Sequence, residues 1–313
     1  MKKKLLLTTL SILGATAFLA SCSKEKEDDY KLKIVTPGQA PLLGIAETID
    51  DNKSNVDLDN SILIEAPVNL PNHFIAGAMD IIVAPVNAGA KLYNAGKSTY
   101  KLAGILTWGN QFFASQNQSF TIDSLNNKEI TIFGEKTVNE LELDIVLNEK
   151  GINVTKTYVS NAGLAMGTLL ADANAMVLTA EPALTAQKGD KNIISYSLND
   201  LYKEVTTYDA PQAAVFVSEN AYSKHKELIE DFLEDLEEET AEINDDTQEA
   251  IAAFTSLGGS GVPAAAIPGS KIKFKSAQDS KAALQYLVSK DIERDIPAED
   301  KIFGKQMDDE FYI

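Results

Sequence analysis

The chain has 313 residues, a formal net charge of −18, one cysteine and two histidines. A strongly acidic surface repels nucleic acid and anionic membrane faces, so this charge excludes a nucleic-acid-binding protein. One cysteine cannot form an internal disulfide, and two histidines are too few for the usual zinc site. A length near 300 residues suits a large core that divides into two domains.

The first 22 residues have the three parts of a secretory signal. Lys2, Lys3 and Lys4 precede an uncharged apolar run at 5–18, which is shorter than the about 20 residues of a membrane span. The run leads into Leu-Ala-Ser-Cys at 19–22, which resembles the lipobox of bacterial lipoproteins. This resemblance implies a signal peptide at 1–21 and a lipid on Cys22 that anchors the protein to the outer face of the bacterial cytoplasmic membrane. The alternative is an ordinary secretory signal followed by an unrelated cysteine.

Residues 22–29 are charged and predict a flexible tether. Beyond the tether, short apolar runs alternate with turns and helical patterns. The first half predicts strands at 32–35, 62–65, 81–84 and 102–107, with helices from 42 and at 89–95. This repetition indicates an α/β fold with a mostly parallel sheet.

The same alternation begins again after residue 130. It predicts strands at 130–133, 154–159, 175–179, 193–196 and 213–217, with helices at 138–148 and 161–171. We therefore predict two α/β lobes joined by crossovers near 112–119 and 209–217. Lobe 1 would contain 30–116 plus 210–313, and lobe 2 would contain 117–209.

The last hundred residues predict a long helix at 219–244, a loop at 255–268 and a helix at 280–290. One face of the long helix is apolar and the other is acidic. We interpret the acidic face as solvated surface rather than a cation site.

Motifs for catalysis and metal binding are incomplete. Gly96-Lys97-Ser98 copies the end of a phosphate-binding loop, but residue 91 is lysine where the rule needs glycine. The run from Asp51 to Asn55 imitates a calcium loop, but Val56 stands in place of the required glycine. The sequence has no Gly-x-Ser-x-Gly elbow, which leaves a Ser–His pair through His73 as an open alternative. We therefore expect no enzyme, no metal and no cofactor.

Polar turns follow the ends of several predicted strands in both halves. Ligands of open α/β sheets bind at these carboxyl ends, where helix N-termini offer free backbone N–H groups. In a two-lobed protein both sets of turns face one cleft. The predicted ligand-binding residues are Gly38, Gln39, Ala40, Asn69, Asn87, Trp108, Gly109, Asn110, Thr137, Asn161 and Glu181.

Three segments resemble the substrate-binding proteins of ABC transporters. They are the opening strand and turn at 33–41, the small-residue, Asp80 and strand segment at 77–85, and the Glu181-Pro182 pair. The likeness is to the nitrate, sulfonate and taurine group, whose relatives bind thiamine precursors, and it covers about residues 30–245. It implies a two-lobed type II periplasmic-binding-protein fold, with each lobe a mostly parallel sheet flanked by helices.

By this resemblance the protein is a monomeric lipoprotein that captures a small solute between its lobes and delivers it to an ABC permease. Trp108 would stack on a flat ligand or pack in the core, and Glu181 would pair with a cationic group or close a hinge hydrogen bond. Arg294 is the only arginine. We therefore expect a neutral, cationic or heteroaromatic solute rather than a simple anion. The alternatives are a sensory or adhesive lipoprotein and a secreted hydrolase.

Overall fold

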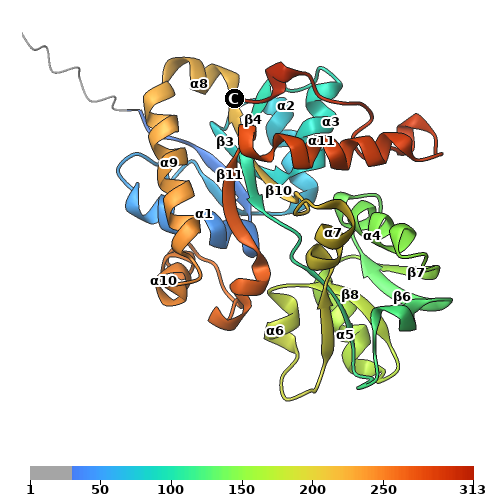
Figure 1. Ribbon diagram of the computed structural model, residues 1–313. Helices are drawn as coiled ribbons and strands as arrows, with labels where there is room; N and C mark the ends of the chain where they lie inside the picture. The colour runs from blue at the N-terminus through green and yellow to red at the C-terminus, as the bar shows by residue number, and fades with distance from the viewer. Residues whose placement is uncertain (1–29) are drawn as a thin grey trace, which may run out of the picture.

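The computed structural model describes residues 30–313 and contains two sheets, each flanked by helices (Figure 1). The predicted two-lobed α/β fold is thereby confirmed. The signal peptide, the tether and Cys22 lie outside the described residues. We call the first sheet and its helices lobe 1, and the second sheet and its helices lobe 2. Lobe 2 lies below lobe 1 in Figure 1.

Lobe 1 has a six-stranded sheet in the order β11-β4-β10-β3-β1-β2. Its strands β1 and β3 are buried along almost their whole length, because helices cover both faces of the sheet. The strands are β1 (Ile34–Pro37), β2 (Ile62–Glu65), β3 (Ile81–Pro85), β4 (Tyr100–Thr107), β10 (Ala213–Ser218) and β11 (Ile272–Ser276).

Seven helices belong to this lobe. The apolar side of α1, with Leu42, Ile45 and Ile49, packs in one core cluster with Phe232 of α9 and Phe254 of α10. The helices are α1 (Ala40–Asp51), α2 (Leu70–Ala76), α3 (Val86–Asn94), α8 (Glu219–Lys224), α9 (Lys226–Glu242), α10 (Thr247–Ser256) and α11 (Ala277–Glu293).

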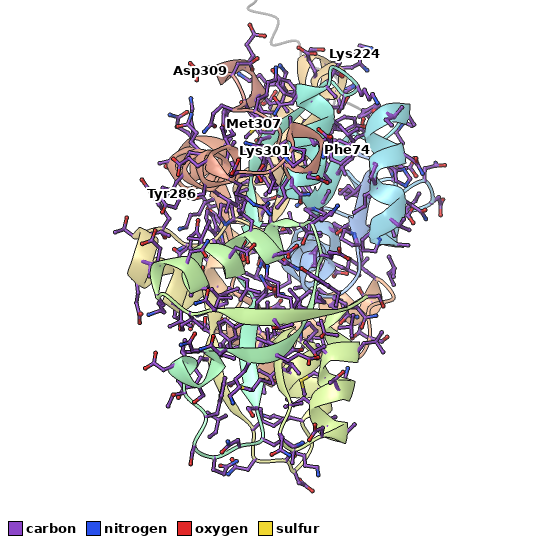
Figure 2. All side chains as sticks on the ribbon, turned by 90° about the vertical axis from the view of Figure 1, so that its right-hand side faces the viewer. Phe74, Lys224, Tyr286, Lys301, Met307 and Asp309 are labelled. Carbon is purple, nitrogen blue, oxygen red and sulfur yellow. The ribbon has the colours of Figure 1, made fainter. Side chains whose placement is uncertain are left out.

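The C-terminal segment folds back onto lobe 1 after α11. Met307 and Phe74 of α2 both lie in the upper part of the molecule in Figure 2 and belong to the same core cluster. Phe311 completes this contact between the chain end and the lobe, since its side chain is fully buried. Among the described residues, no helix is both long and apolar enough to cross a membrane.

Lobe 2 has a five-stranded sheet in the order β7-β6-β8-β5-β9. Strands β6 and β7 pair in parallel without a register shift, with Lys128 opposite Val154. The strands are β5 (Gln111–Ser115), β6 (Lys128–Phe133), β7 (Val154–Val159), β8 (Met176–Ala180) and β9 (Ile194–Ser197), and the helices are α4 (Val138–Glu149), α5 (Ala162–Ala171), α6 (Ala183–Gln187) and α7 (Leu198–Thr206).

Both sheets are mixed, which differs from the mostly parallel sheets that we predicted. Strand β10 runs antiparallel to β3 and β4, and β5 runs antiparallel to β8 and β9. These are the strands next to the two crossings between lobes, and each enters its sheet from the opposite direction to the β-α-β units. The sequence pattern of apolar runs does not report strand direction.

The chain crosses between the lobes at two short segments. Connection 1 is 108–110 and connection 2 is 207–212, and an isolated antiparallel bridge joins Trp108 to Pro211. The first crossing comes earlier than the expected 112–119, because residues 111–115 form β5 of the second sheet. The predicted helix at 219–244 is interrupted at His225, and the predicted loop at 255–268 follows the unpredicted α10.

Candidate functional site

A cavity of about 400 Å³ lies between the two lobes. Gln39 and Gly261 line it from lobe 1, and Asn110 lines it from connection 1. We call it the cleft cavity. The remaining lining residues all belong to lobe 2 and are Phe133, Asn161, Ala162, Gly163, Ala180, Glu181, Pro182, Ala183, Ala186 and Gln187.

Gln39 is held in a strained backbone conformation at the start of α1. Its φ of 64° and ψ of −137° lie in a region that favours glycine. Such a conformation costs on the order of 1–3 kcal/mol and is found preferentially at functional sites. No side chain caps α1, so the first-turn N–H groups of this 12-residue helix keep their positive partial charge beside the cavity. Gly38 and Ala40 flank Gln39 without lining the cavity.

Asn161 caps α5 from the opposite lobe. Its Oδ1 accepts a hydrogen bond from the Leu164 N–H at 3.0 Å. Its Nδ2 has no hydrogen-bond partner among the described residues, and the residue is exposed at the cavity wall. Gly163, two residues on, leaves room for Gln187, since a Cβ there would come within 3.0 Å of the Gln187 Nε2. Two helix N-termini and four side-chain amides therefore converge on one cavity.

Thr185 of the same lobe holds the carboxylate of Glu181 in place at the cavity wall. Its Oε1 accepts a hydrogen bond from the Thr185 Oγ1 at 2.7 Å, and its Oε2 accepts one from the Thr185 N–H at 3.0 Å. The Asn110 Nδ2 donates to the Glu181 carbonyl at 2.9 Å, and the Glu181 N–H donates to the Asn110 carbonyl at 3.0 Å. The bonds to connection 1 are thus made by the backbone of Glu181, while its side chain bonds within lobe 2.

Trp108 packs in the core of the hinge rather than in the cleft cavity. Its side chain is 4% exposed, and its Nε1 donates to the Lys273 carbonyl at 2.7 Å. The Lys275 Nζ lies 4.3 Å from the centroid of its ring. Gly109, which follows it, has a φ of 51°, and a Cβ there would come within 2.5 Å of the Asn199 Cβ. Glycine is therefore required at 109, because any side chain there would clash with Asn199.

Three other predicted residues lie away from the cleft cavity. Thr137 caps α4 and donates its hydroxyl to the Gly134 carbonyl at 2.6 Å. Asn87 lies in the first turn of α3, and its buried Oδ1 has no partner among the described residues. Asn69 donates to the Glu65 carboxylate at 2.9 Å.

His73 belongs to the same group as Asn69. Its Nε2 lies 2.8 Å from the second carboxylate oxygen of Glu65. Hydrogen bonds from Asn69 and His73 hold the pKa of Glu65 below its usual value. Within the described part of the chain, no serine hydroxyl is a hydrogen-bond partner of His73.

A buried carboxyl group ties both connections together behind the cleft cavity. The Gln111 Nε2 and the Gln212 Nε2 each donate to the Glu142 Oε2 at 3.0 Å. Gln212 also accepts from the Asn110 N–H at 3.2 Å through its Oε1. Glu142 is fully buried, and this burial raises its pKa to about 8. At neutral pH the hinge is therefore built around a protonated carboxyl group.

Several cavity residues escaped the sequence prediction. Phe133 ends β6, and the small residues Ala162, Gly163 and Ala186 give the cavity its space. The sequence could have indicated Phe133, because this residue ends a predicted strand and directly precedes the Gly134 turn. The helices that carry the small residues have no pattern that separates a cavity wall from a packed core.

The cleft cavity is almost free of charge. No lysine or arginine lines it, and the carboxylate of Glu181 is already hydrogen-bonded. Among residues 30–313, no group of His, Cys, Asp or Glu side chains is arranged to hold a metal ion. The arrangement can therefore bind hydrogen-bond acceptors through helix N-termini and amides, with Phe133 as an apolar surface.

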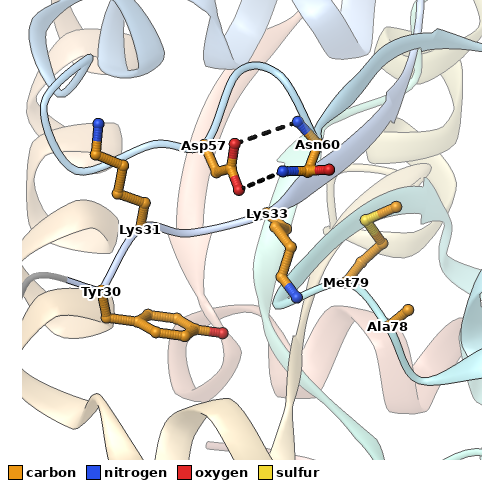
Figure 3. Close-up of a pocket in the computed structure, with 7 residues that line it drawn as sticks. All are labelled: Tyr30, Lys31, Lys33, Asp57, Asn60, Ala78 and Met79. Carbon is orange, nitrogen blue, oxygen red and sulfur yellow. Dashed lines mark hydrogen bonds between the residues drawn. The ribbon is translucent and has the colours of Figure 1, made fainter.

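A larger hollow of about 670 Å³ lies wholly on lobe 1 (Figure 3). Figure 3 shows Lys33 and Met79 on its wall and the two hydrogen bonds between Asp57 and Asn60. It lies at the start of β1, whereas the carboxyl end of β1 leads into Gln39. Because only one lobe lines it, relative motion of the lobes does not enclose it. The cleft cavity is therefore the better candidate site.

Solved structures with a similar fold include proteins of ABC transport systems. An ABC transporter protein from Parabacteroides distasonis matches with a TM-score of 0.73 and 22% identity, covering 91% of this chain and 99% of that one. The protein has the periplasmic-binding-protein fold. The ligand-binding component of an ABC-type import system from Staphylococcus aureus, with zinc bound, has a TM-score of 0.61 at 13% identity and coverages of 88% and 98%.

A third solved structure with this fold is the aliphatic sulphonate binding protein SsuA from Escherichia coli. Its TM-score is 0.61 at 14% identity, with 83% of this chain and 85% of that chain covered. No protein-family model and no curated protein match the sequence. The likeness therefore lies in the fold, and it agrees with the family that the sequence motifs suggested.

Proposed function

We propose that this protein is the solute-binding component of an ABC importer and that it captures a small organic solute in the cleft cavity. The observation that carries the proposal is the cavity itself, which both lobes line and at which the N-termini of α1 and α5 converge. Ligands of open α/β sheets bind at such strand ends. No bond is broken in this role, and the protein acts by binding and release.

Closure of the lobes would enclose the solute. The lobes already meet at one side, where a Cβ on Gly269 would come within 2.8 Å of the Glu181 side chain. They also meet where the Lys136 Nζ lies 3.1 Å from the Asp300 Oδ1. A solute that contacts both walls binds the closed state better, and only this difference in affinity shifts the population.

The lining favours a neutral solute that carries hydrogen-bond acceptors and a flat apolar part. Acceptor oxygens or ring nitrogens would meet the Asn161 Nδ2 and the first-turn N–H groups of α1. The flat part would lie on Phe133. Glu181 is the one charged side chain at this wall, and Thr185 already donates to both of its oxygens, so a cationic group of a solute would share this carboxylate with Thr185.

Anchoring and delivery complete the proposal. Cys22 would carry the lipid, and the body would stand on the outer face of the cytoplasmic membrane beside an ABC permease. Radiolabelled palmitate should enter the wild-type protein and be absent from Cys22→Ser. Labelling of Cys22→Ser to the wild-type level would contradict the lipid anchor without touching the solute proposal.

Native mass spectrometry tests solute binding directly. Residues 23–313 contain every helix and strand that the structure describes. The purified protein should carry a stoichiometric small molecule that leaves on mild denaturation, and its mass identifies the solute. A mass without any adduct, together with no thermal stabilisation by vitamins, nucleobases or sulfonates, would overturn the proposal.

A further inference from the structure

A stripe of lysines runs along β11, the edge strand of lobe 1. Lys271, Lys273 and Lys275 occupy alternate positions, with Ile272 and Phe274 between them. The two apolar side chains are each 3% exposed and pack in the core. Because alternate residues of a strand point to opposite faces, Lys273 and Lys275 lie on the other face. Lys271 precedes the strand, and all three lysines line the same hollow.

These lysines border a second hollow between the lobes, of about 360 Å³. Lys203 of α7 lines it from lobe 2, and Trp108 and Asp209 line it from the two connections. We call it the hinge hollow. It is distinct from the cleft cavity, since Trp108 lines the hinge hollow and Asn110 lines the cleft cavity. Gly109 between them has a φ of 51°, so the connection is not a regular extended strand at this point.

The charge of the hinge hollow is opposite to that of the protein. Four lysines line it against two aspartates, in a chain with a net charge of −18. Three ion pairs are present, with Lys203 to Asp209 at 3.2 Å, Lys271 to Asp200 at 3.3 Å and Lys275 to Asp209 at 3.5 Å. The lysines of these pairs are partly exposed to solvent, and such pairs contribute little energy, so the lysines can turn to another anion at small cost.

Two further features point to a ligand rather than to surface lysines alone. Lys271 has a φ of 50°, a left-handed conformation that a lysine adopts at a cost of about 1–2 kcal/mol. Lys273 has no ionic partner among residues 30–313 and remains exposed at the hollow. Lysines on an edge strand also prevent pairing with the edge strand of another molecule. This protective role does not explain why the lysines line a concave hollow that lobe 2 also lines.

We propose that the hinge hollow binds a small multivalent oxyanion of the phosphate or sulfate type. Lysine holds such anions as a point charge, and here lysines from both lobes can surround one anion. The anion would bridge β11 and α7 and displace the weak pairs to Asp200 and Asp209. This site is separate from the cleft cavity, and the proposal does not depend on the identity of the solute.

Trp108 provides the readout, because it is the only tryptophan and it lines the hinge hollow. Residues 23–313 are titrated with sodium pyrophosphate, sodium phosphate and sodium sulfate, with sodium chloride at matched ionic strength as the reference. We expect a saturable change of tryptophan emission with at least one oxyanion and none with chloride. Calorimetric titration with the same salts gives the stoichiometry, which should be one.

Two double variants decide the location of the site. Lys271→Gln with Lys273→Gln should weaken oxyanion binding at least tenfold and leaves the Lys275–Trp108 contact in place. Lys97→Gln with Lys128→Gln removes the same charge from exposed positions elsewhere and should change the affinity less than twofold. The proposal is overturned if no oxyanion gives a response beyond that of chloride. It is equally overturned if both double variants bind like the wild type, since the lysines would then only protect the edge strand.

Discussion

The two hollows between the lobes are lined by different residues of the same connection and differ in their chemistry. The cleft cavity, which Asn110 lines, has Glu181 as its one charged side chain and offers helix N-termini, amides and one aromatic ring. The hinge hollow on the Trp108 side carries four lysines. On the function that we propose, most donors to the solute are backbone N–H groups at helix N-termini and side-chain amides rather than charged side chains. The lysines between the lobes lie instead at the hinge hollow.

Filling the cleft cavity should have the largest effect. Ala186 is exposed on α6 at the cavity wall, so Ala186→Trp would occupy solute space without disturbing the core. We expect the co-purified solute to be lost, with affinity reduced roughly 100-fold or more, which is about 2.7 kcal/mol. Native mass spectra of the variant should show the mass without adduct. Ala171→Trp, at the exposed far end of α5, is the matched control and should keep the adduct. Retention of the solute by Ala186→Trp would remove the cleft cavity from the proposed function.

A substitution at the hinge should change the stability of the protein rather than its affinity for the solute. Gly109→Ala adds a Cβ 2.5 Å from the Asn199 Cβ at a φ of 51°. Strain and crowding together should lower the free energy of unfolding by about 3–4 kcal/mol. Gly151→Ala separates the two causes, since its φ is 66° and nothing lies within 4 Å of the added Cβ. This control should lose only about 1–2 kcal/mol in urea denaturation. Equal losses in the two variants would mean that the hinge has room to relax.

The contrast between the two hollows also marks what the sequence could and could not predict. Strands such as 154–159 were placed correctly because apolar and β-branched residues cluster between turn residues. Gln39, Asn110, Asn161 and Glu181 were found at the cleft cavity because strand ends and helix starts meet there. Trp108 and Gly109 were assigned to the cleft because sequence alone does not say to which side of a connection a side chain points.

Direction and pairing of strands depend on tertiary contacts that leave no local pattern. The predicted crossover at 112–119 overlaps β5 (Gln111–Ser115), although Phe112 and Phe113 are typical strand residues. Their partners, β8 and β9, come more than 60 residues later in the chain. The alternation of lysines from Lys271 to Lys275 is visible in the sequence. The sequence does not show that Lys203 of α7 lies across the hinge and lines the same hollow.

The buried carboxyl group at the hinge predicts a pH dependence. The pKa of Glu142 is raised from 4.5 to about 8, so the folded state favours the protonated form. Its stabilising contribution is complete below pH 4.5 and is lost as the pH rises toward 8. Glu142→Gln mimics the protonated group and should remove this loss. The variant should be as stable as the wild type near pH 5 and more stable at pH 8–9, as measured by urea denaturation at each pH.

Glu140, on the same helix, provides the opposite control. Burial raises the pKa of Glu140, but hydrogen bonds from Lys156 and Tyr158 outweigh it, so the pKa is lowered. The contribution of Glu140 is therefore present above its usual value of 4.5 and is lost as the pH falls. Glu140→Gln should reduce stability at pH 7 and have less effect at pH 4. Parallel pH profiles of the two variants would contradict the assignment of a neutral carboxyl group to the hinge.

The smallest effect should come from a single amide at the cleft cavity. Asn161→Ala removes the cap of α5, which costs about 1 kcal/mol of stability, and also removes the free Nδ2 donor. Loss of one hydrogen bond to the solute corresponds to a roughly 3- to 10-fold lower affinity. The fraction of protein that keeps its co-purified solute after dialysis measures this change. Ser197→Ala removes the cap of α7 and lies outside the cleft cavity, so it should lose similar stability and keep the solute. If both variants release the solute equally, the effect of Asn161 is on the stability of lobe 2, and the donors of the site are the backbone N–H groups of α1 and α5.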